Sequence, residues 1–455
     1  MVDYFFPPIG GPGVQRTLGY VKHLAEFGWA PVVLTVRSGE FPIRDVSLLQ
    51  SVPDAVIVHR TASLEPVRFV KRLLTWASGR RDGSGGSSLG SGRPLWRGSG
   101  RLRNLEKWIL FPDRRIGWLP FAVARAVSMS RRQPVDIIYS TSTAMTSHLI
   151  AYFLKRLLGK PWVADFQDPW LEDYVSHFPT AWHGRAAKRL EELVVRNADR
   201  VTVTNEPHRK IIEESYPAIP PDKLVVIPMG FDPDVFRSVR AVTRRKFTLT
   251  HLGNFYSVRS PATFLAALAK CLGEHEGLEQ DIEVLFFGGF DAKVLSDTEQ
   301  LLDRHGLREV VRLMGFVAHG TGLQHLMSST VLLLVTDTGV GGRNQIPTKL
   351  LEYLATGRPI LALAPDGVTA EIVRAANAGL IVRPDSVKDI GDAIFELYRR
   401  WRNGNLAFPV DHGVVRRFEW GELTARFASA LDDALTCAGT GRAKSVPVAI
   451  EEEGM

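Results

Sequence analysis

Short apolar runs alternate with amphipathic stretches along most of the chain. The apolar runs are rich in β-branched residues and predict strands, whereas the amphipathic stretches repeat with the helical period and predict helices. In 14–27, for example, Val14, Leu18, Val21 and Ala25 fall on one face of a helix. Further helices are expected at 144–158, 183–197 and 420–436, and strands at 31–36, 55–58, 135–140, 161–166, 200–204, 224–227, 247–252, 282–287, 310–313, 331–335, 359–363 and 380–382.

This repeating pattern predicts an α/β fold with parallel sheets, because strands as apolar as these need helices on both faces. Two such sets, each of roughly 200 residues, indicate two Rossmann-like domains facing across a cleft. We expect an N-terminal domain at 1–230, a linker at 231–246 and a C-terminal domain at 247–410. The polar tail 437–455 contains three consecutive glutamates and is expected to be disordered.

Composition excludes several classes of protein. The chain has 455 residues and is 45% hydrophobic, which is too apolar for a disordered protein and too long for one ordinary core. Its two cysteines, Cys271 and Cys437, cannot staple a fold of this size, and no Cys/His cluster suggests zinc. No signal peptide is recognisable, and no apolar run is long enough to span a bilayer. We therefore expect a cytoplasmic protein without a structural metal.

Positive charge is concentrated in the first half of the chain. The formal net charge is +7, and residues 68–132 contain 15 Lys and Arg against 3 Asp and Glu. Within this block, 78–103 is rich in Gly and Ser and predicts a flexible basic loop. Basic residues beside tryptophans indicate an anionic membrane surface as a partner, and a solvated arginine-rich loop is the alternative. No nucleic-acid-binding motif accompanies the charge.

The first candidate site is a glycine-rich turn at 7–16, directly before a helix. Gly11 and Gly13 allow the backbone to approach a ligand closely, and the start of the helix offers free N–H groups to an anion. Arg16 adds a cation on the first turns of that helix. A glycine turn before a helix is also a common structural feature, so both interpretations stay open.

The second candidate site is the segment 346–360, where a helix is expected to begin at Pro347 and to end at Gly357. Thr348 and Glu352 share a face of this helix, and Lys349 lies in its first turn. The helix start with Lys349 predicts an anion site, and Glu352 is suited to accept two hydrogen bonds from a ribose diol. The alternative is a solvated pair of helical side chains.

The third candidate site, 251–261, begins where a strand ends in a loop that contains Gly253. This loop presents Arg259 just before the next helix. Ligands of open α/β sheets bind at this carboxyl edge, where an arginine can hold a diphosphate by paired hydrogen bonds. A surface arginine without a partner is the alternative.

The order of these segments resembles a known family. Phe-Pro-Pro-x-Gly-Gly-x-Gly-x-x-Arg (6–16) is followed by Asp-Phe-Gln-Asp-Pro-Trp (165–170), Pro-Met-Gly-Phe-Asp (228–232), the loop from Gly253 to Arg259, and Pro-x-Lys-x-x-Glu-Tyr-Leu (347–354). The chain is similar in this respect to the retaining glycosyltransferases of family 4, over roughly residues 3 to 436. The resemblance implies the two-domain GT-B fold and a helix at 411–436 that packs back on the N-terminal domain.

The resemblance also implies a nucleotide-diphosphate sugar as co-substrate, with no metal and no other cofactor. By position, Glu352 matches the glutamate that binds the ribose, and Arg259 the basic residue on the diphosphate, with Lys349 as its helper. The main chain near Val317 matches the segment that holds the base. Thr348 belongs to the same helix start.

On the N-terminal side, Gly11 and Gly13 match the loop that faces the donor phosphates. His148 matches a histidine near the transferred sugar, and Asp168 an aspartate on the acceptor side. A histidine packed at a domain edge is the alternative for His148, and a turn residue before proline is the alternative for Asp168.

Three departures from the family pattern affect these expectations. Asn344 replaces the first of two glutamates, so a sugar hydroxyl would meet a neutral amide there. Asn254 replaces an arginine that follows the glycine. The chain also begins so close to the glycine turn that the preceding central strand is nearly absent, which would leave neighbouring backbone groups unpaired. We therefore suspect a start upstream of Met1.

The resulting hypothesis is a metal-independent retaining glycosyltransferase. It would move a sugar to a hydroxyl of a glycan or lipid-linked acceptor in the synthesis of cell-surface polysaccharide or glycoconjugates. A location on the inner face of the membrane, through residues 68–132, would suit a lipid-linked acceptor. Two alternatives stay open: a nucleotide-sugar epimerase with the GT-B fold, and a catalytically degenerate partner subunit.

Overall fold

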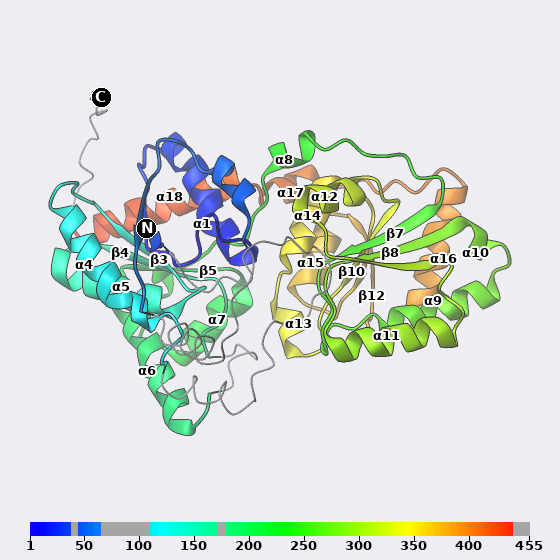
Figure 1. The fold of residues 1–455 in the computed structure, drawn as a ribbon, viewed down its shortest axis with the longest axis horizontal. Coiled ribbons are helices and arrows are strands. Elements are labelled where there is room, and N and C mark those ends of the chain that lie inside the picture. The colour runs from blue at the N-terminus through cyan, green and yellow to red at the C-terminus, as the bar shows by residue number, and fades with distance from the viewer. Residues whose placement is uncertain (38–43, 65–109, 172–177, 440–455) are drawn as a thin grey trace, which may run out of the picture. The chain divides into compact units, whose positions relative to one another are not determined.

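The computed structural model describes residues 1–37, 44–64, 110–171 and 178–439, which form two compact units (Figure 1). Unit 1 contains the described residues up to Ile227 together with residues 424–439, and unit 2 contains Pro228–Leu423. The expected basic loop at 78–103 and tail residues 440–455 lie outside the described residues. No helix in the described ranges is long and apolar enough to cross a membrane.

Unit 1 is built on a parallel sheet, as the apolar strand pattern predicts. Strands β1 and β2 pair with each other, and β3, β4, β5 and β6 pair in chain order. The strands are β1 (Val32–Val36), β2 (Ile57–Thr61), β3 (Ile138–Thr141), β4 (Trp162–Phe166), β5 (Arg200–Val203) and β6 (Leu224–Val226). The helices are α1 (Pro12–His23), α4 (Leu119–Ser130), α5 (Met145–Leu158), α6 (Ala181–Asn197) and α7 (Glu206–Ser215), and short 3₁₀ turns lie at Leu24–Phe27, Val46–Ser51, Ile116–Trp118 and Pro221–Lys223.

The first residues of the chain join the two groups of strands in unit 1. Val2 forms parallel bridges with Leu34 of β1 on one side and with Ser140 of β3 on the other. Its N–H donates to the Tyr139 carbonyl at 2.7 Å, and the Asp3 N–H donates to the Leu34 carbonyl at 3.1 Å. The expectation of unpaired backbone on both sides is therefore wrong, because residues 1–3 pair with both neighbours.

Unit 2 contains one six-stranded parallel sheet in the order β12-β11-β10-β7-β8-β9. Numbered from the first strand of the unit, this is the doubly wound order 3-2-1-4-5-6 read from its far edge, and the direction of winding reverses between β7 and β10. The strands are β7 (Phe247–Leu252), β8 (Ile282–Phe287), β9 (Val311–Gly315), β10 (Val331–Val335), β11 (Ile360–Leu363) and β12 (Gly379–Val382).

Helices cover both faces of the unit 2 sheet (Figure 1). Along β10, Val331 and Leu333 belong to a core that includes residues of α9 and α16, whereas Leu332 and Leu334 belong to a second core with residues of α12 and α14. This alternation explains why the strand is apolar at every position. The helices of unit 2 are α8 (Pro233–Arg237), α9 (Ala262–Glu274), α10 (Leu278–Asp281), α11 (Ala292–Arg304), α12 (His319–Met327), α13 (Val340–Asn344), α14 (Thr348–Thr356), α15 (Val368–Ala375), α16 (Val387–Arg402) and α17 (His412–Arg416).

Two expected boundaries differ from the structure. Residues 231–246, expected as a linker, belong to unit 2, because Phe231 and Phe236 are buried in the same core as α14. The final helix, α18 (Trp420–Cys437), begins in unit 2 and continues in unit 1 from Thr424, whereas α17 lies entirely in unit 2. Within unit 1, Phe427 of α18 stacks on Tyr20 of α1 with ring centroids 4.2 Å apart.

Candidate functional site

The candidate site of unit 2 lies at the carboxyl ends of β7 and β10, where the winding of the sheet reverses. Gly253 follows β7 with φ of 144°, and a Cβ there would lie 2.6 Å from Nζ of Lys349. Only glycine therefore allows Lys349 to approach the main chain so closely. Asn254 accepts a hydrogen bond from the Gly289 N–H at 2.8 Å, so this departure from the family pattern links the loops after β7 and β8.

Arg259 is held in place by an ion pair. Its Nε donates to Oδ1 of Asp337 at 3.1 Å, and the two side chains are 13% and 4% exposed. The guanidinium also lies 4.9 Å from the centroid of the Tyr256 ring. The alternative interpretation of Arg259, a surface arginine without a partner, is therefore wrong. Because Asp337 engages Nε, the terminal nitrogens of the guanidinium, with their four N–H groups, extend beyond this contact.

Lys349 is oriented by a buried histidine. Nδ1 of His251 lies 2.9 Å from the Leu333 carbonyl, which can only accept, so Nδ1 carries the proton. Nε2 then accepts a hydrogen bond from Nζ of Lys349 at 3.1 Å. The histidine ring is itself fixed by stacking on Phe255, with centroids 4.3 Å apart. Lys349 is therefore fixed by tertiary contacts, whereas a solvated lysine would move freely.

Burial and the nearby charge of Arg259 lower the pKa of Lys349 well below its usual 10.5, while Asp337 and Glu352 act in the opposite direction. Burial and Lys349 lower the pKa of His251 in the same way. Because Arg259, Asp337 and Glu352 all act on one amine, these side chains form a single electrostatic cluster. Its two cations repel each other, which an anion placed between them would relieve.

Glu352 lies one turn into α14, and its carboxylate is already engaged. Oε1 of Glu352 and Nε2 of His319 are 2.8 Å apart, with the two side chains 22% and 51% exposed. His319 begins α12, directly after the β9–α12 loop that contains Val317 and the 67% exposed Phe316. His319 thus connects Glu352, which is expected to bind a ribose, to the segment that is expected to bind the base.

The start of α14 is fixed by its own contacts. The Tyr353 hydroxyl accepts a hydrogen bond from the Leu252 N–H at 2.8 Å, which ties the helix to the end of β7. Thr348 is the first residue of the helix, after Pro347 at the N-cap, and Asn344 ends the short α13 that precedes it. Arg259, Lys349 and Glu352 are thus brought together, with Thr348 and Asn344 in the adjoining segment.

The sequence did not reveal three members of this cluster: His251, Asp337 and His319. Each lies next to a predicted feature, since His251 is the penultimate residue of an apolar strand, Asp337 follows one, and His319 begins a helix. For His251 and Asp337 the only signal was a polar residue at the carboxyl end of a parallel strand, which many other positions share, and His319 had no such signal.

In unit 1, the glycine turn lies against the loop after β3. Gly11 is the N-cap of α1 with φ of 106°. A Cβ at Gly13 would lie 2.7 Å from the Thr143 methyl carbon, so the turn passes close to that side chain. Both glycines therefore have a structural role, and the predicted contact of this turn with donor phosphates stays a prediction.

Arg16 is enclosed in the core of unit 1. Its guanidinium forms two hydrogen bonds to Oδ1 of Asp165, at 3.0 and 2.7 Å, and one to Oδ2 at 2.8 Å, and both side chains are 0% exposed. Asp165 also accepts hydrogen bonds from Tyr139, Thr141 and Thr202. Burial in the core and the ion pair with a buried carboxylate favour a structural role for Arg16, and its assignment to substrate binding stays a prediction.

His148 is fully buried in unit 1. Its Nδ1 lies 2.8 Å from the Ser140 hydroxyl, and its ring stacks on Phe166 with centroids 4.8 Å apart. Burial lowers its pKa to about 3, so the ring is neutral at neutral pH. This placement favours the alternative of a packed histidine. Asp168, in contrast, is exposed two residues after β4, and its predicted role on the acceptor side stays a prediction.

No group of three or more His, Cys, Asp and Glu side chains in the described ranges is placed to hold a metal ion. The cluster of unit 2 combines two cations, Arg259 and Lys349, with the carboxylates of Asp337 and Glu352, and its cations suit an anion. Two parallel α/β domains, the second with such a cluster at its switch point, are typical of proteins that bind nucleotides.

Family models match both halves of the chain. A model described as a glycosyl transferase 4-like domain matches residues 10–230, and one described as glycosyl transferases group 1 matches residues 246–400. Together they span most of the sequence, and the chain belongs to the glycosyltransferases with the GT-B fold.

Solved structures agree with this fold. The Anabaena protein HepE, solved in complex with UDP, matches with a TM-score of 0.63 and 15% identity, over 95% of this chain and 99% of that one. Sucrose-phosphate synthase from Thermosynechococcus elongatus matches with a TM-score of 0.59 and 16% identity, over 95% and 96% of the two chains. The predicted α/β fold with two Rossmann-like domains is therefore confirmed.

Curated relatives match over part of their length. An exopolysaccharide phosphotransferase of Streptomyces coelicolor is 28% identical over 247 residues, which is 52% of this chain and 24% of that protein. A D-inositol 3-phosphate glycosyltransferase of Stackebrandtia nassauensis is 24% identical over 258 residues, which is 54% of this chain and 56% of that protein. The matched part thus covers little more than half, or less, of each of these relatives.

Proposed function

We propose that the protein is a retaining glycosyltransferase that moves a sugar from a nucleotide-diphosphate donor to a hydroxyl of a glycan or lipid-linked acceptor. The observation that carries the proposal is the cluster of Arg259 and Lys349 at the switch point of unit 2, beside the start of α14. The solved complexes of HepE with UDP and UDP-glucose support a nucleotide sugar as the donor.

Leaving-group stabilisation is the role we assign to the cations. When the bond between sugar and diphosphate breaks, negative charge grows on the diphosphate and positive charge grows on the sugar ring. Donors that are already in position stabilise this charge most, because they need no reorganisation. Asp337 holds Arg259 and His251 holds Lys349 in such fixed positions. The first turn of α14 adds main-chain N–H groups that face an anion favourably.

In the retaining mechanism, the acceptor hydroxyl attacks the face that the diphosphate leaves. The departing phosphate oxygen takes the proton of this hydroxyl, so no side-chain nucleophile is required. A buried, neutral His148 is compatible with this mechanism, because the mechanism requires no side-chain base. We assign no metal and no cofactor to the reaction beyond the donor itself.

Nucleotide recognition is assigned to the β9–α12 loop and to α14. Glu352 accepts hydrogen bonds from the ribose hydroxyls, and the main chain near Val317 holds the base. His319, which contacts Glu352 in the structure, orients that carboxylate. Asn344, at the end of α13, offers a neutral amide to a sugar hydroxyl. Thr348 follows in the same segment as the first residue of α14.

The acceptor and the location are inferred from the names of the relatives and from the charge of the chain. The names of the relatives point to sugar transfer onto small polar alcohols or to exopolysaccharide chemistry. We propose a cell-surface polysaccharide or glycoconjugate pathway, with unit 1, including Asp168, on the acceptor side. We also propose that residues 68–132, of which 68–109 lie outside the described residues, hold the protein on the inner face of an anionic membrane.

Calorimetry and a transfer assay test the function. UDP, GDP, ADP and TDP are titrated into the protein, and one of them should bind with a dissociation constant in the micromolar range typical of substrates, about 1 μM to 1 mM. The matching nucleotide sugar is then incubated with and without acceptor alcohols. Consumption of the donor without any acceptor would indicate an epimerase, and failure to bind every nucleotide would indicate a degenerate partner subunit.

A further inference from the structure

A second cationic site lies at the opposite edge of the unit 2 sheet. The segment before β7 carries Arg244, Arg245 and Lys246, and therefore lies at the amino ends of the strands, whereas the loops of the candidate donor site follow their carboxyl ends. Together with Glu283 at the start of β8 and the end of α12, these residues line a cavity of about 420 Å³. A cavity of this size suits a small ligand.

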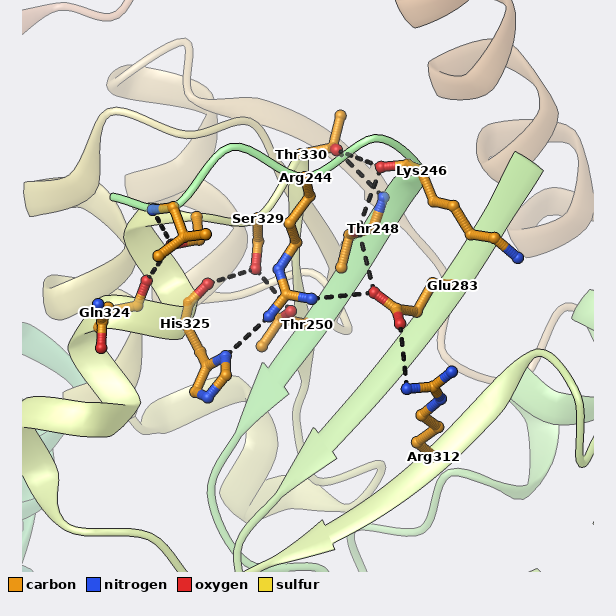
Figure 2. A network of polar contacts seen from close by, with 12 residues as sticks. Arg244, Lys246, Thr248, Thr250, Glu283, Arg312, Gln324, His325, Ser329 and Thr330 are labelled. Atoms are coloured by element: carbon orange, nitrogen blue, oxygen red, sulfur yellow. Dashed lines mark hydrogen bonds and ion pairs between the residues drawn. The ribbon is translucent and has the colours of Figure 1, made fainter. Parts of the chain in front are cut away.

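Arg244 is fixed at the centre of the cavity lining. Its guanidinium donates to Oε1 of Glu283 at 3.0 Å and to Nδ1 of His325 at 2.8 Å, as Figure 2 shows. Because arginine only donates, Nδ1 of His325 is an acceptor, and burial together with Arg244 lowers the pKa of His325. The histidine is therefore neutral and adds no charge to the site.

The chain around Arg244 is also tied down. The Val242 N–H donates to the Ser328 hydroxyl at 2.8 Å, and the Thr248 N–H donates to the Thr330 hydroxyl at 3.1 Å. The His325 ring stacks on Phe287 with centroids 4.4 Å apart. The cavity is thus held in shape from both sides, so a ligand would not have to order it.

Positive charge exceeds negative charge at this site. Glu283 is the only carboxylate among the residues that line the cavity, and it is shared by Arg244 and, at 3.8 Å, by Arg312 (Figure 2). Arg245 and Lys246 are exposed, and Lys246 extends away from Arg244 past Glu283 in Figure 2. The three cations that line the cavity, together with Arg312, outnumber this one carboxylate, which leaves an excess of positive charge that attracts an anion.

A structural role explains only part of this arrangement. The contacts of Arg244 with Glu283 and His325 hold the segment before β7 to β8 and α12. They do not account for the cavity, nor for the two exposed cations that follow Arg244 directly. In addition, Gln324 is an exposed amide at the wall of the cavity that can donate a hydrogen bond to a ligand oxygen.

We propose that this cavity binds a phosphorylated small molecule through its phosphate group. Arg244, Arg245 and Lys246 neutralise the phosphate charge, and Gln324 donates to one of its oxygens. The site is separate from the candidate donor site and does not depend on the proposed transfer reaction.

Calorimetry with small phosphates tests this site. Inorganic pyrophosphate, inorganic phosphate and glucose 1-phosphate are each titrated into the wild type, the double variant Arg245→Ala/Lys246→Ala, and the donor-site variant Arg259→Ala. We expect the double variant to lose at least about tenfold in affinity for one class of sites, and Arg259→Ala to retain that class. Stronger binding of glucose 1-phosphate than of inorganic phosphate would support a phosphorylated small molecule as the ligand, and the reverse order would overturn it.

Two controls separate a built site from general attraction to positive charge. The variant Lys293→Ala/Arg304→Ala removes two exposed cations of α11 and should leave phosphate affinity unchanged. Glu283→Gln removes the only carboxylate of the cavity and keeps a hydrogen-bond partner for Arg244, so it should tighten binding.

Equal losses in the Arg245→Ala/Lys246→Ala and Lys293→Ala/Arg304→Ala variants, or no phosphate binding outside the donor site, would overturn the proposal. Binding to anionic phospholipid vesicles in place of all three small phosphates would also overturn it. Because the loss is measured relative to Arg259→Ala, failure of the donor site leaves this test intact.

Discussion

Each unit contains an Arg–Asp pair whose buried aspartate lies on or just after a strand of its sheet, and the two pairs differ in their surroundings. In unit 1, Asp165 on β4 accepts hydrogen bonds from Arg16 and from three hydroxyl groups, and neither member of the pair is exposed. In unit 2, Asp337 engages Arg259 through Nε, beside Lys349, whose pKa is lowered. The first pair is complete within the protein, whereas the second belongs to a cluster that an anion would complete.

Whether the protein itself supplies all partners of a charged side chain distinguishes a structural role from ligand binding better than the residue type does. Arg16 and Arg259 are both arginines near glycine-containing turns, and the sequence suggests ligand contact for both. A buried charge with all its partners supplied internally has no capacity left for a ligand. A partly exposed cation beside another cation remains electrostatically unsatisfied.

The largest effect is expected from breaking the pair in unit 1. Asp165→Ala leaves the buried charge of Arg16 without a partner, which should cost about 3–5 kcal/mol of unfolding free energy. Urea denaturation measures this loss. The exposed Asp136 provides the control, because Asp136→Ala should change stability by no more than about 0.5 kcal/mol. Equal stability of the two variants would contradict a structural role for the pair.

In unit 2, removing the arginine of the pair should affect activity more than stability. Arg259→Ala is expected to lower kcat/KM at least about tenfold, equivalent to about 1.4 kcal/mol of transition-state stabilisation, because it removes a fixed cation from the leaving group. Steady-state kinetics with a verified donor measures it. Arg304→Ala, at an exposed end of α11, should leave kcat/KM unchanged. Unchanged kinetics in Arg259→Ala would remove the basis of the comparison.

Proton uptake should accompany nucleotide binding in unit 2. Burial and Arg259 lower the pKa of Lys349 in the free protein, and a bound diphosphate would raise it again. Binding therefore takes up a proton, and affinity falls as the pH rises between the lowered pKa and the higher pKa of the complex. Calorimetry with UDP in buffers of different ionisation enthalpy measures the uptake.

Lys349→Met identifies the group that takes up this proton. The variant should bind UDP more weakly and without the proton uptake, whereas Lys293→Ala should retain it. If uptake persists in Lys349→Met, another group of the cluster, such as the buried His251, would be responsible.

The smallest effect is expected at the edge of the site. Glu352→Ala should raise the donor KM by roughly tenfold, because two hydrogen bonds to the ribose are lost. His319→Ala removes only a group that orients Glu352, so we expect a rise of about two- to fivefold in KM with kcat unchanged. A larger effect in His319→Ala than in Glu352→Ala would show that the histidine itself contacts the donor.

Much of the fold could be predicted because secondary structure depends on local pattern. All twelve predicted strands occur, and the helix expected from Pro347 is observed as α14. The linker prediction failed because proline and charge at 231–246 suggested a loop, whereas Phe231 and Phe236 are buried in a core contributed by distant residues. Burial of a short segment depends on what packs against it, and local pattern does not contain that information.

The sequence by itself determined the order of strands and helices, because apolar spacing is a property of neighbouring residues. It also placed Arg259 at the carboxyl edge of a parallel sheet, where ligands bind, and the resemblance to the family grouped it with Lys349 and Glu352. Only the tertiary structure decided that Arg16 and His148 are enclosed, and that His251, Asp337 and His319 hold the site residues. These outcomes depend on contacts between residues far apart in the chain. Arg16 and Asp165, for example, are separated by 149 positions.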